Sequence, residues 1–167
     1  HIQLALKVFP TNTRPELLDS FARFNLWQAG LDYRHGTGHG VGALLNVHEI
    51  PIIANRKSAE FGGIQENMII TNEPGYYEND NFGIRIENCY RTMKADTRYQ
   101  FASFLKFEPL TYVPIQLDLI NKSMLSNEEI EWLNKYHQNC LTRVGEILKK
   151  ENKNDVYDWL VEQTKSI

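Results

Sequence analysis

The residues best able to do chemistry are three histidines close together in the sequence and three glutamates that follow them. They are His35, His39, His48, Glu49, Glu73 and Glu87. Imidazole and carboxylate groups together suit manganese, iron, cobalt or zinc. Four glycines in the segment HGTGHGVG, residues 35–42, would let an ion or a substrate backbone come close to the histidines. The spacing leaves two interpretations open, a metal site and a turn with surface histidines.

A zinc site on a helix is a poor match to this segment. His35 and His39 are four residues apart, which would place them on one helix face, but the intervening glycines argue against a helix. The chain also lacks the His-Glu-x-x-His motif. Glu73 directly precedes Pro74 and Gly75, so it is either a solvated residue beside a turn or a side chain leaving the end of a strand.

Glu87 has a more informative setting, because residues 82–94 alternate between apolar and polar side chains. Ile84 and Ile86 would point to one face and Arg85 and Glu87 to the other, which predicts one continuous strand. A carboxylate buried in such a strand needs a partner, because an unpaired buried charge is costly. That partner would be a salt bridge or a metal ion.

The elements that must position these residues form an α+β body. Residues 3–9 suggest a short strand, and residues 15–29 predict an amphipathic helix that ends at Gly30. Thr13 and Glu16 form a candidate capping box for that helix. The apolar residues at helical spacing are Leu17, Phe21, Phe24 and Trp27. Short strands are also expected at residues 68–71, 104–107 and 110–113.

The composition changes after Pro114, and apolar residues then recur at helical spacing. Ser126 and Glu129 form a second candidate capping box, for a helix that runs to about Lys150. Asp155 is the candidate cap of a final helix. We therefore predict two parts, residues 1–114 and a helical extension of residues 115–167. Three aromatic residues of the extension are expected to pack, either into the body or into a partner subunit, namely Trp132, Tyr136 and Trp159.

Composition excludes several classes of protein. The 167 residues carry 18 basic and 21 acidic side chains and a net charge of −3, which gives no electrostatic basis for binding nucleic acid or an anionic membrane. No apolar run is long enough for a transmembrane helix, and no signal peptide is expected. Two cysteines, Cys89 and Cys140, fit a reducing compartment. Because the first residue is His1, we expect the chain to be part of something longer.

Three further strings follow HGTGHGVG in order, namely NVHE, TNEPGYYE and FGIRIEN. Together the four strings resemble the X-Pro aminopeptidase (aminopeptidase P) branch of the creatinase/methionine-aminopeptidase superfamily, and the cytosolic eukaryotic type in particular. The resemblance implies an α/β pita-bread fold, with residues 1–114 as the C-terminal part of the catalytic domain. It also implies an enzyme that removes the N-terminal residue from peptides with proline in second position. That enzyme would be cytoplasmic and a homodimer.

The resemblance implies a role for each candidate residue. His39, Glu73 and Glu87 would bind two divalent metal ions, with manganese favoured and zinc or cobalt as alternatives. Glu87 would bridge the ions, and Glu73 would also be the general base. His35 and His48 would be catalytic, non-ligand histidines that bind the substrate and its transition state. Arg85 would support the ligands, and Tyr76 and Tyr77 would form a wall.

The chain departs from the family in one respect. Two aspartate ligands should precede His39, and the only aspartates there, Asp19 and Asp32, do not match their positions. We therefore expect this chain alone to be inactive and to need the N-terminal remainder of the same enzyme.

Two alternatives to this enzyme stay open. One is a metal-free interaction module, which the retention of His39, Glu73 and Glu87 disfavours. The other is a different pita-bread enzyme, such as a prolidase or a methionine aminopeptidase. The FGIRIEN string and the helical tail argue against that second alternative.

Overall fold

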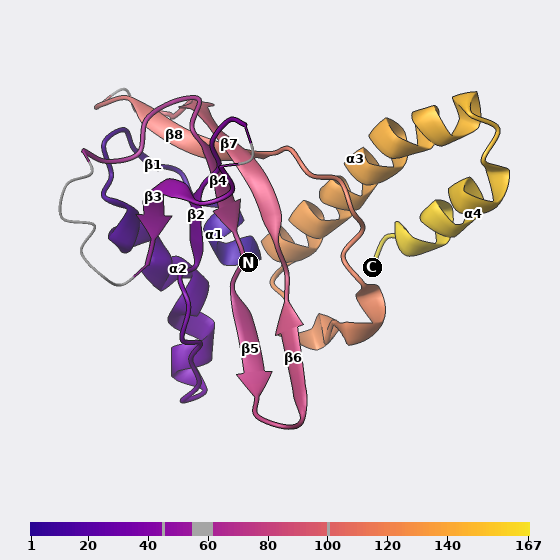
Figure 1. The fold of residues 1–167 in the computed structure, drawn as a ribbon, viewed down its shortest axis with the longest axis horizontal. Helices are drawn as coiled ribbons and strands as arrows, with labels where there is room; N and C mark the ends of the chain where they lie inside the picture. Colours follow the sequence, from indigo (N-terminus) through magenta and orange to yellow (C-terminus); the bar gives the residue numbers. More distant parts are fainter. Residues whose placement is uncertain (45, 55–61, 100) are drawn as a thin grey trace. The chain divides into compact units, whose positions relative to one another are not determined.

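The computed structural model describes residues 1–44, 46–54, 62–99 and 101–167. They form two compact units, Gln3–Thr111 and Tyr112–Ile167. The first unit mixes helices with sheet, and the second is helical (Figure 1). The sequence-based boundary after residue 114 stays a prediction.

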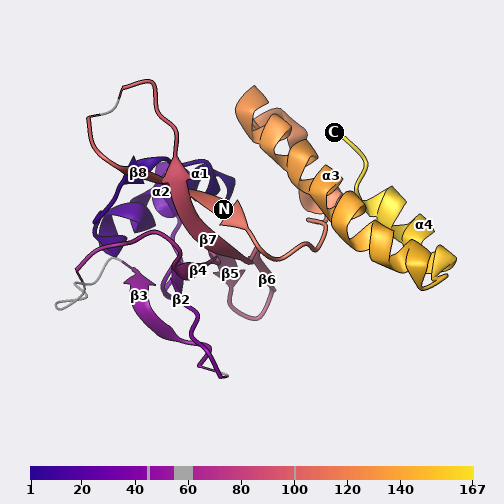
Figure 2. The ribbon, with the colours of Figure 1, turned by 90° about the horizontal axis from the view of Figure 1, so that it is seen from above.

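The first unit is built on a six-stranded antiparallel sheet in the order β1-β8-β7-β4-β2-β3. Its strands are β1 (Phe9–Pro10), β2 (Gly38–Gly40), β3 (Glu49–Ile53), β4 (Ile69–Asn72), β7 (Asn88–Ala95) and β8 (Phe104–Pro109). Strands β7 and β8 pair over six residues, and β4 joins them to the short strand β2. Figure 2 shows this sheet from above, with its strands curled around α2. The mixed α/β prediction is confirmed.

The core of this unit lies between the sheet and two helices, α1 (Ile2–Ala5) and α2 (Pro15–Gln28). Its buried members are Leu4, Phe9, Leu18, Ile53, Ile64, Ile70 and Leu105. Residues 3–9 were expected to be a strand, but they form α1 and then enter β1. Leu4 and Phe9 are buried in the core, whereas Val8 is 49% exposed, so the apparent alternation of Leu4, Leu6 and Val8 did not mark one face of a strand.

The helix expected over residues 15–29 is confirmed, but its predicted cap is wrong. Arg14 is the N-cap and makes no side-chain cap, while the Thr13 hydroxyl donates to the carbonyl of Pro10 at 2.6 Å. Thr13 is therefore used by the preceding turn. The predicted end is confirmed, because Gly30 has φ of 73° and its N–H donates to the carbonyl of Trp27.

The buried face of α2 differs from the expected one. Four large apolar residues lie on its exposed face and are between 42% and 59% exposed, namely Leu17, Phe21, Phe24 and Trp27. The helix instead buries Leu18, Asp19 and Arg23. Polar groups with good partners can be buried as fully as apolar ones, and the periodicity of apolar residues does not detect them.

The strand expected over residues 82–94 is interrupted. Strand β6 (Phe82–Arg85) pairs with β5 (Gly75–Glu78) in a separate hairpin, and β7 begins only at Asn88. Figure 1 shows this hairpin extending away from the six-stranded sheet. The chain changes sheets at Ile86 and Glu87, where the N–H of Ile86 donates to the carbonyl of Pro74 at 3.4 Å.

Two other expectations for strands are revised. Strand β4 confirms the element expected near residues 68–71, and β8 that near residues 104–107, although β8 continues to Pro109. Residues 110–113 form no strand. The N–H of Leu110 donates to the carbonyl of Cys89, which continues the pairing with β7 by one residue before the chain turns away.

The second unit contains α3 (Asn127–Lys150) and α4 (Asn154–Gln163), preceded by two 3-10 turns at Leu117–Leu119 and Lys122–Met124. The capping box of Ser126 and Glu129 is confirmed. The predicted cap of α4 by Asp155 is wrong, because Lys153 is the N-cap and makes no side-chain cap. In the described part of the chain, no helix has the length and apolarity needed to cross a membrane.

Side chains of α3 hold the segment that leads into it. The hydroxyl of Tyr136 donates to the carbonyl of Val113 at 2.9 Å, and the N–H of Ile115 donates to Nε2 of His137 at 3.0 Å. Trp132 stacks on Tyr136 with an interplanar angle of 2°. These two aromatic residues therefore pack as expected, whereas Trp159 is 54% exposed.

Candidate functional site

The glycines of β2 let neighbouring strands of the protein itself come close. A side chain at Gly38 would collide with the carbonyl of Thr71, and one at Gly40 would collide with the carbonyl of Ile50. His39 stands between these two glycines, where β2 is bulged against β3. The glycines therefore bring β2 against its neighbours and fix the position of His39 beside the end of β4.

His39 and Glu73 form the centre of the candidate site. Nε2 of His39 lies 3.1 Å from Oε1 of Glu73, and both side chains are 12% exposed. Nδ1 of His39 hydrogen-bonds to the carbonyl of Gly40 at 2.8 Å. The Thr71 hydroxyl donates to Oε1 of Glu73 at 3.0 Å and accepts from the N–H of His39 at 3.0 Å. Thr71 thus links the carboxylate of Glu73 to the backbone of His39.

Arg85 and Tyr77 extend this centre to His35. Nη1 of Arg85 lies 3.6 Å from Oε2 of Glu73, and Nε of Arg85 donates to the Tyr77 hydroxyl at 2.9 Å. That hydroxyl also hydrogen-bonds to Nε2 of His35 at 2.9 Å. The hydrogen bond to Tyr77, followed by the charges of Glu73 and Glu87, raises the pKa of Arg85. The guanidinium is therefore a permanent positive charge beside Glu73.

An open cavity of about 690 Å³ lies beside His35. It is lined by Asp32, Tyr33, Arg34, His35, Tyr77, Glu78 and Asn79. Tyr76, the neighbouring residue of β5, instead donates its hydroxyl to Glu78 at 2.9 Å. Of the two tyrosines expected to form a wall, Tyr77 thus lines this cavity and contacts the histidine.

His48 lies on the other side of His39. The centres of the two imidazole rings are 4.3 Å apart, with an angle of 50° between their planes. His48 directly precedes β3, and the residue is exposed. The fold thus brings His35, His39, His48, Glu73 and Arg85 into one connected array, although they come from separate segments.

Glu87 has a different setting from the expected one. It lies in the break between β6 and β7, is exposed, and makes no ion pair with Arg85 or with any other described residue. Arg85 pairs with Glu73 instead. After burial, the negative charges of Glu87 and Glu73 are the next causes that raise the pKa of Cys89. The carboxylates of Glu87 and Glu73 therefore both lie close enough to Cys89 to influence its thiol.

The donor set fits part of a metal site. The hydrogen bond of Nδ1 to Gly40 leaves Nε2 of His39 free to bind a cation beside Glu73, an arrangement common among histidine ligands. In residues 1–44, 46–54, 62–99 and 101–167, however, no group of three or more histidine, cysteine, aspartate or glutamate side chains is placed to hold a metal ion. These residues can supply ligands, and further ligands would have to join them.

Two residues that organise the site were missed in the sequence. Thr71 lies two positions before Glu73, so the two side chains share one side of the extended chain, and that spacing was a usable signal. Thr37 accepts a hydrogen bond from the N–H of Glu73 through its carbonyl at 2.7 Å. A backbone contact of this kind leaves no mark in the residue types.

The mixed α/β fold and its histidine–glutamate pair are those of a pita-bread domain. Residues 1–93 match metallopeptidase family M24, and residues 103–167 match the C-terminal region of peptidase M24. The chain belongs to the M24 family.

Its relatives include X-Pro aminopeptidases. The chain is 48% identical to Xaa-Pro aminopeptidase app-1 of Caenorhabditis elegans over 100% of its own length and 27% of that protein. It is 46% identical to aminopeptidase P2 of Arabidopsis thaliana over 100% of its length and 23% of that protein. The resemblance inferred from the sequence motifs is thereby confirmed. The chain spans about a quarter of the length of these relatives.

A crystal structure shows the same fold. It is that of X-prolyl aminopeptidase from C. elegans, described as a cytosolic enzyme with a di-nuclear active site. The TM-score is 0.94 with 47% identity, and the match covers 100% of this chain and 27% of that one. The predicted pita-bread fold is confirmed.

Proposed function

We propose that this chain is the C-terminal part of a dinuclear X-Pro aminopeptidase, which removes the N-terminal residue from peptides with proline in second position. The observation that carries the proposal is the pairing of His39 with Glu73 at 3.1 Å, in a chain 48% identical to a protein of that name. Proline fixes its own φ and leaves no amide donor, so a peptide bond before it calls for a dedicated site.

In this proposal His39, Glu73 and Glu87 hold two divalent metal ions. Manganese is our first choice, and zinc and cobalt also accept histidine and carboxylate ligands. When bound, such ions lower the pKa of water and polarise the substrate carbonyl. Glu87 would be a ligand of both ions. Its exposure in the break between β6 and β7 leaves its carboxylate oxygens accessible to the ions.

The remaining residues act on protons and on the substrate. Glu73 takes the proton of the attacking water. Arg85 pairs with the second carboxylate oxygen of Glu73, Oε2. His35 and His48 donate hydrogen bonds to the substrate as charge develops on its carbonyl oxygen. Tyr77 orients His35 through its hydroxyl and lines the cavity where the peptide would lie.

The site is completed by protein outside residues 1–167. Two further carboxylates, aspartates according to the family resemblance, would join the three ligands, and the chain alone would be inactive. The exposed apolar face of α2, which carries Leu17, Phe21, Phe24 and Trp27, supports such a partner, because large apolar patches commonly mark interfaces. The occupant we propose is the N-terminal remainder of the same enzyme, since the relatives are about four times longer. A cytoplasmic location and a homodimer belong to the same proposal.

Hydrolysis of an X-Pro-X tripeptide tests the function. We expect the full-length enzyme to cleave it in manganese buffer, to leave the matching X-Ala-X tripeptide nearly intact, and to lose activity in His39→Ala. The 167-residue chain should be no more active than that variant. Equal cleavage of both peptides would indicate a general aminopeptidase. A folded full-length protein that binds no metal and cleaves neither peptide would instead favour the interaction module.

A further inference from the structure

A buried ion pair on α2 lies next to the glycine-rich segment. Nε of Arg23 donates to Oδ2 of Asp19 at 2.7 Å, and the side chain of each is only 2% exposed. Burying two charges costs desolvation free energy, and well-packed apolar residues would often be as stable or more stable. Stability alone is therefore a weak reason for this pair, so its other contacts are informative.

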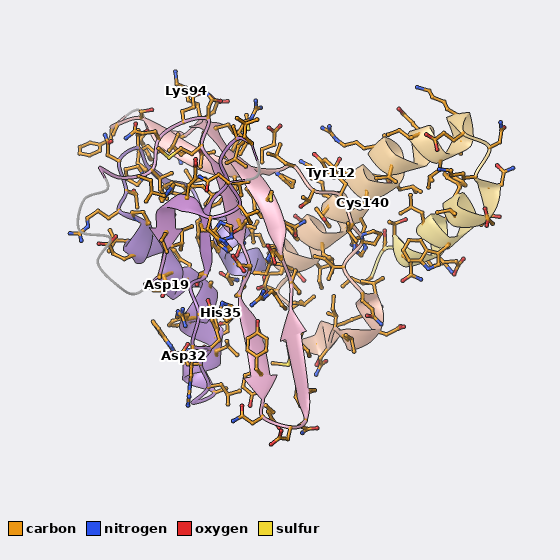
Figure 3. All side chains as sticks on the ribbon, in the orientation of Figure 1. Asp19, Asp32, His35, Lys94, Tyr112 and Cys140 are labelled. Atoms are coloured by element: carbon orange, nitrogen blue, oxygen red, sulfur yellow. The ribbon has the colours of Figure 1, made fainter. Side chains whose placement is uncertain are left out.

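The guanidinium of Arg23 binds the chain just before β2. It donates to the carbonyl of Tyr33 at 2.6 Å, to the carbonyl of His35 at 2.7 Å and to the carboxylate of Asp32 at 2.7 Å. It also lies 3.8 Å from the centre of the Tyr33 ring. In Figure 3, Asp19, Asp32 and His35 are seen beside one another along α2. One side chain thus fixes the backbone on both sides of Arg34.

The second oxygen of Asp19 binds Thr37. The Thr37 hydroxyl donates to Oδ1 of Asp19 at 2.6 Å and also contacts the Tyr33 hydroxyl. Burial raises the pKa of Tyr33 to about 12, so this phenol keeps its proton and can donate to Thr37. Asp19, Thr37 and the Tyr33 side chain are all nearly inaccessible to solvent.

The backbone of Thr37 passes this constraint on to the site. Its N–H donates to the carbonyl of Ile53 at 2.7 Å, and its carbonyl accepts from the N–H of Glu73 at 2.7 Å. Three hydrogen bonds therefore connect Arg23 to the backbone of Glu73, through Asp19 and Thr37. Glu73 in turn faces His39, which lies two residues after Thr37.

We propose that Asp19 and Arg23 are positioning residues for the reaction, which hold Glu73 and His35 in place through Thr37 and the backbone of residues 33–37. The inference rests on the proposed function. It also gives Asp19, which matches no metal ligand of the family, a role of its own.

Substitutions in the full-length enzyme test the proposal, with an ion pair elsewhere as control. We expect Asp19→Asn and Arg23→Lys to lower kcat about 10- to 100-fold, because small displacements at a reacting centre are costly, while KM changes less than about threefold. Thr37→Val should lower kcat to a similar extent, whereas Thr37→Ser, which keeps the hydroxyl, should retain most of the wild-type kcat. Arg91→Lys is the control, because Arg91 pairs with Glu108 at 2.6 Å between β7 and β8. It should leave kcat within about twofold.

Amide hydrogen exchange separates positioning from stability, measured where circular dichroism shows each variant to be folded. Exchange at Thr37 and Glu73 should rise at least about tenfold in Asp19→Asn and stay unchanged in Arg91→Lys. A lower Tm with wild-type kcat and wild-type exchange at these amides would overturn the proposal. If the wild-type enzyme shows no X-Pro activity, the proposed function fails, and the exchange experiment still decides whether Asp19 holds Glu73.

Discussion

Nε2 of His39 lies 3.1 Å from Oε1 of Glu73, across the neighbouring strands β2 and β4, and the hydroxyl of Thr71 bonds to both residues. Nδ1 of the imidazole is engaged by the carbonyl of Gly40, so Nε2 is the nitrogen that faces Glu73. The Gly40 carbonyl and the Thr71 hydroxyl together orient the pair.

Glu87→Gln should remove metal from the full-length enzyme. A bridging carboxylate would touch both ions, so its neutral isostere should release at least one ion per chain and lower activity by more than the roughly 100-fold cost of losing an outer-shell partner. Elemental analysis after gel filtration, together with X-Pro hydrolysis, provides the measurement. Glu108→Gln, which changes a carboxylate of β8, is the control. Full metal content and normal activity in Glu87→Gln would show that Glu87 is no ligand.

His35→Ala and His48→Ala should retain their metal and lose kcat. Each histidine is proposed to donate one hydrogen bond to the transition state, and loss of such a donor costs about 100- to 1,000-fold in rate. Kinetics and metal content should be measured on the same samples. If metal falls in step with activity, that histidine is a ligand. If the kinetics are unchanged, the residue serves only in packing.

The exposed face of α2 should behave differently in the 167-residue chain and in the full-length enzyme. Phe24→Lys should destabilise the full-length enzyme by about 2 kcal/mol, which is typical of losing a buried aromatic residue. In the chain alone the same change should cost less than about 0.5 kcal/mol, because Phe24 is exposed there. Urea unfolding measures both values. Phe101→Lys is the control, since Phe101 is 93% exposed.

Equal effects of Phe24→Lys in the two proteins would contradict an interface on α2. Binding of a hydrophobic dye provides an independent check. The chain alone should bind more dye than the full-length enzyme, and Phe24→Lys should reduce that excess.

His137 should make the stability of the helical unit depend on pH. Burial lowers the pKa of His137 below the ordinary value of 6.5, and its Nε2 accepts a hydrogen bond from Ile115. Because the folded-state pKa is depressed, the stabilisation is complete above pH 6.5 and is lost as the pH falls through the folded-state pKa. The Tm should therefore fall as the pH drops below 6.5. His137→Gln should flatten that part of the curve, and an unchanged slope would contradict this role.

Local signals allowed much of the fold to be predicted. The capping box of Ser126 and Glu129 lies within one turn of helix and was predicted correctly, as was the end of α2 at Gly30. The buried face of α2 was not predicted, because Asp19 and Arg23 are buried by partners that follow much later in the chain. The break at Glu87 arises where the chain leaves the β5–β6 hairpin for the six-stranded sheet, and alternation along one strand carries no information on that crossing.

The candidate site was predicted by a mixture of chemistry and family resemblance. Residue types alone selected His39 and Glu73 as candidates, and the fold brings them together. The glycines around His39 suggested room for an ion or a substrate, whereas Gly38 and Gly40 make room for the neighbouring strands. Thr37 and Arg23 escaped notice because many of their partners are backbone carbonyls and N–H groups, which residue types do not reveal.

The measurement closest to the central claim is the metal content of the full-length enzyme, followed through removal by a chelator and stepwise return of manganese. The account predicts two ions per chain, loss of X-Pro hydrolysis with the metal, recovery in proportion to the metal returned, and neither full metal content nor recovery in His39→Ala. Hydrolysis that survives complete removal of metal would contradict it, and so would two firmly bound ions in His39→Ala.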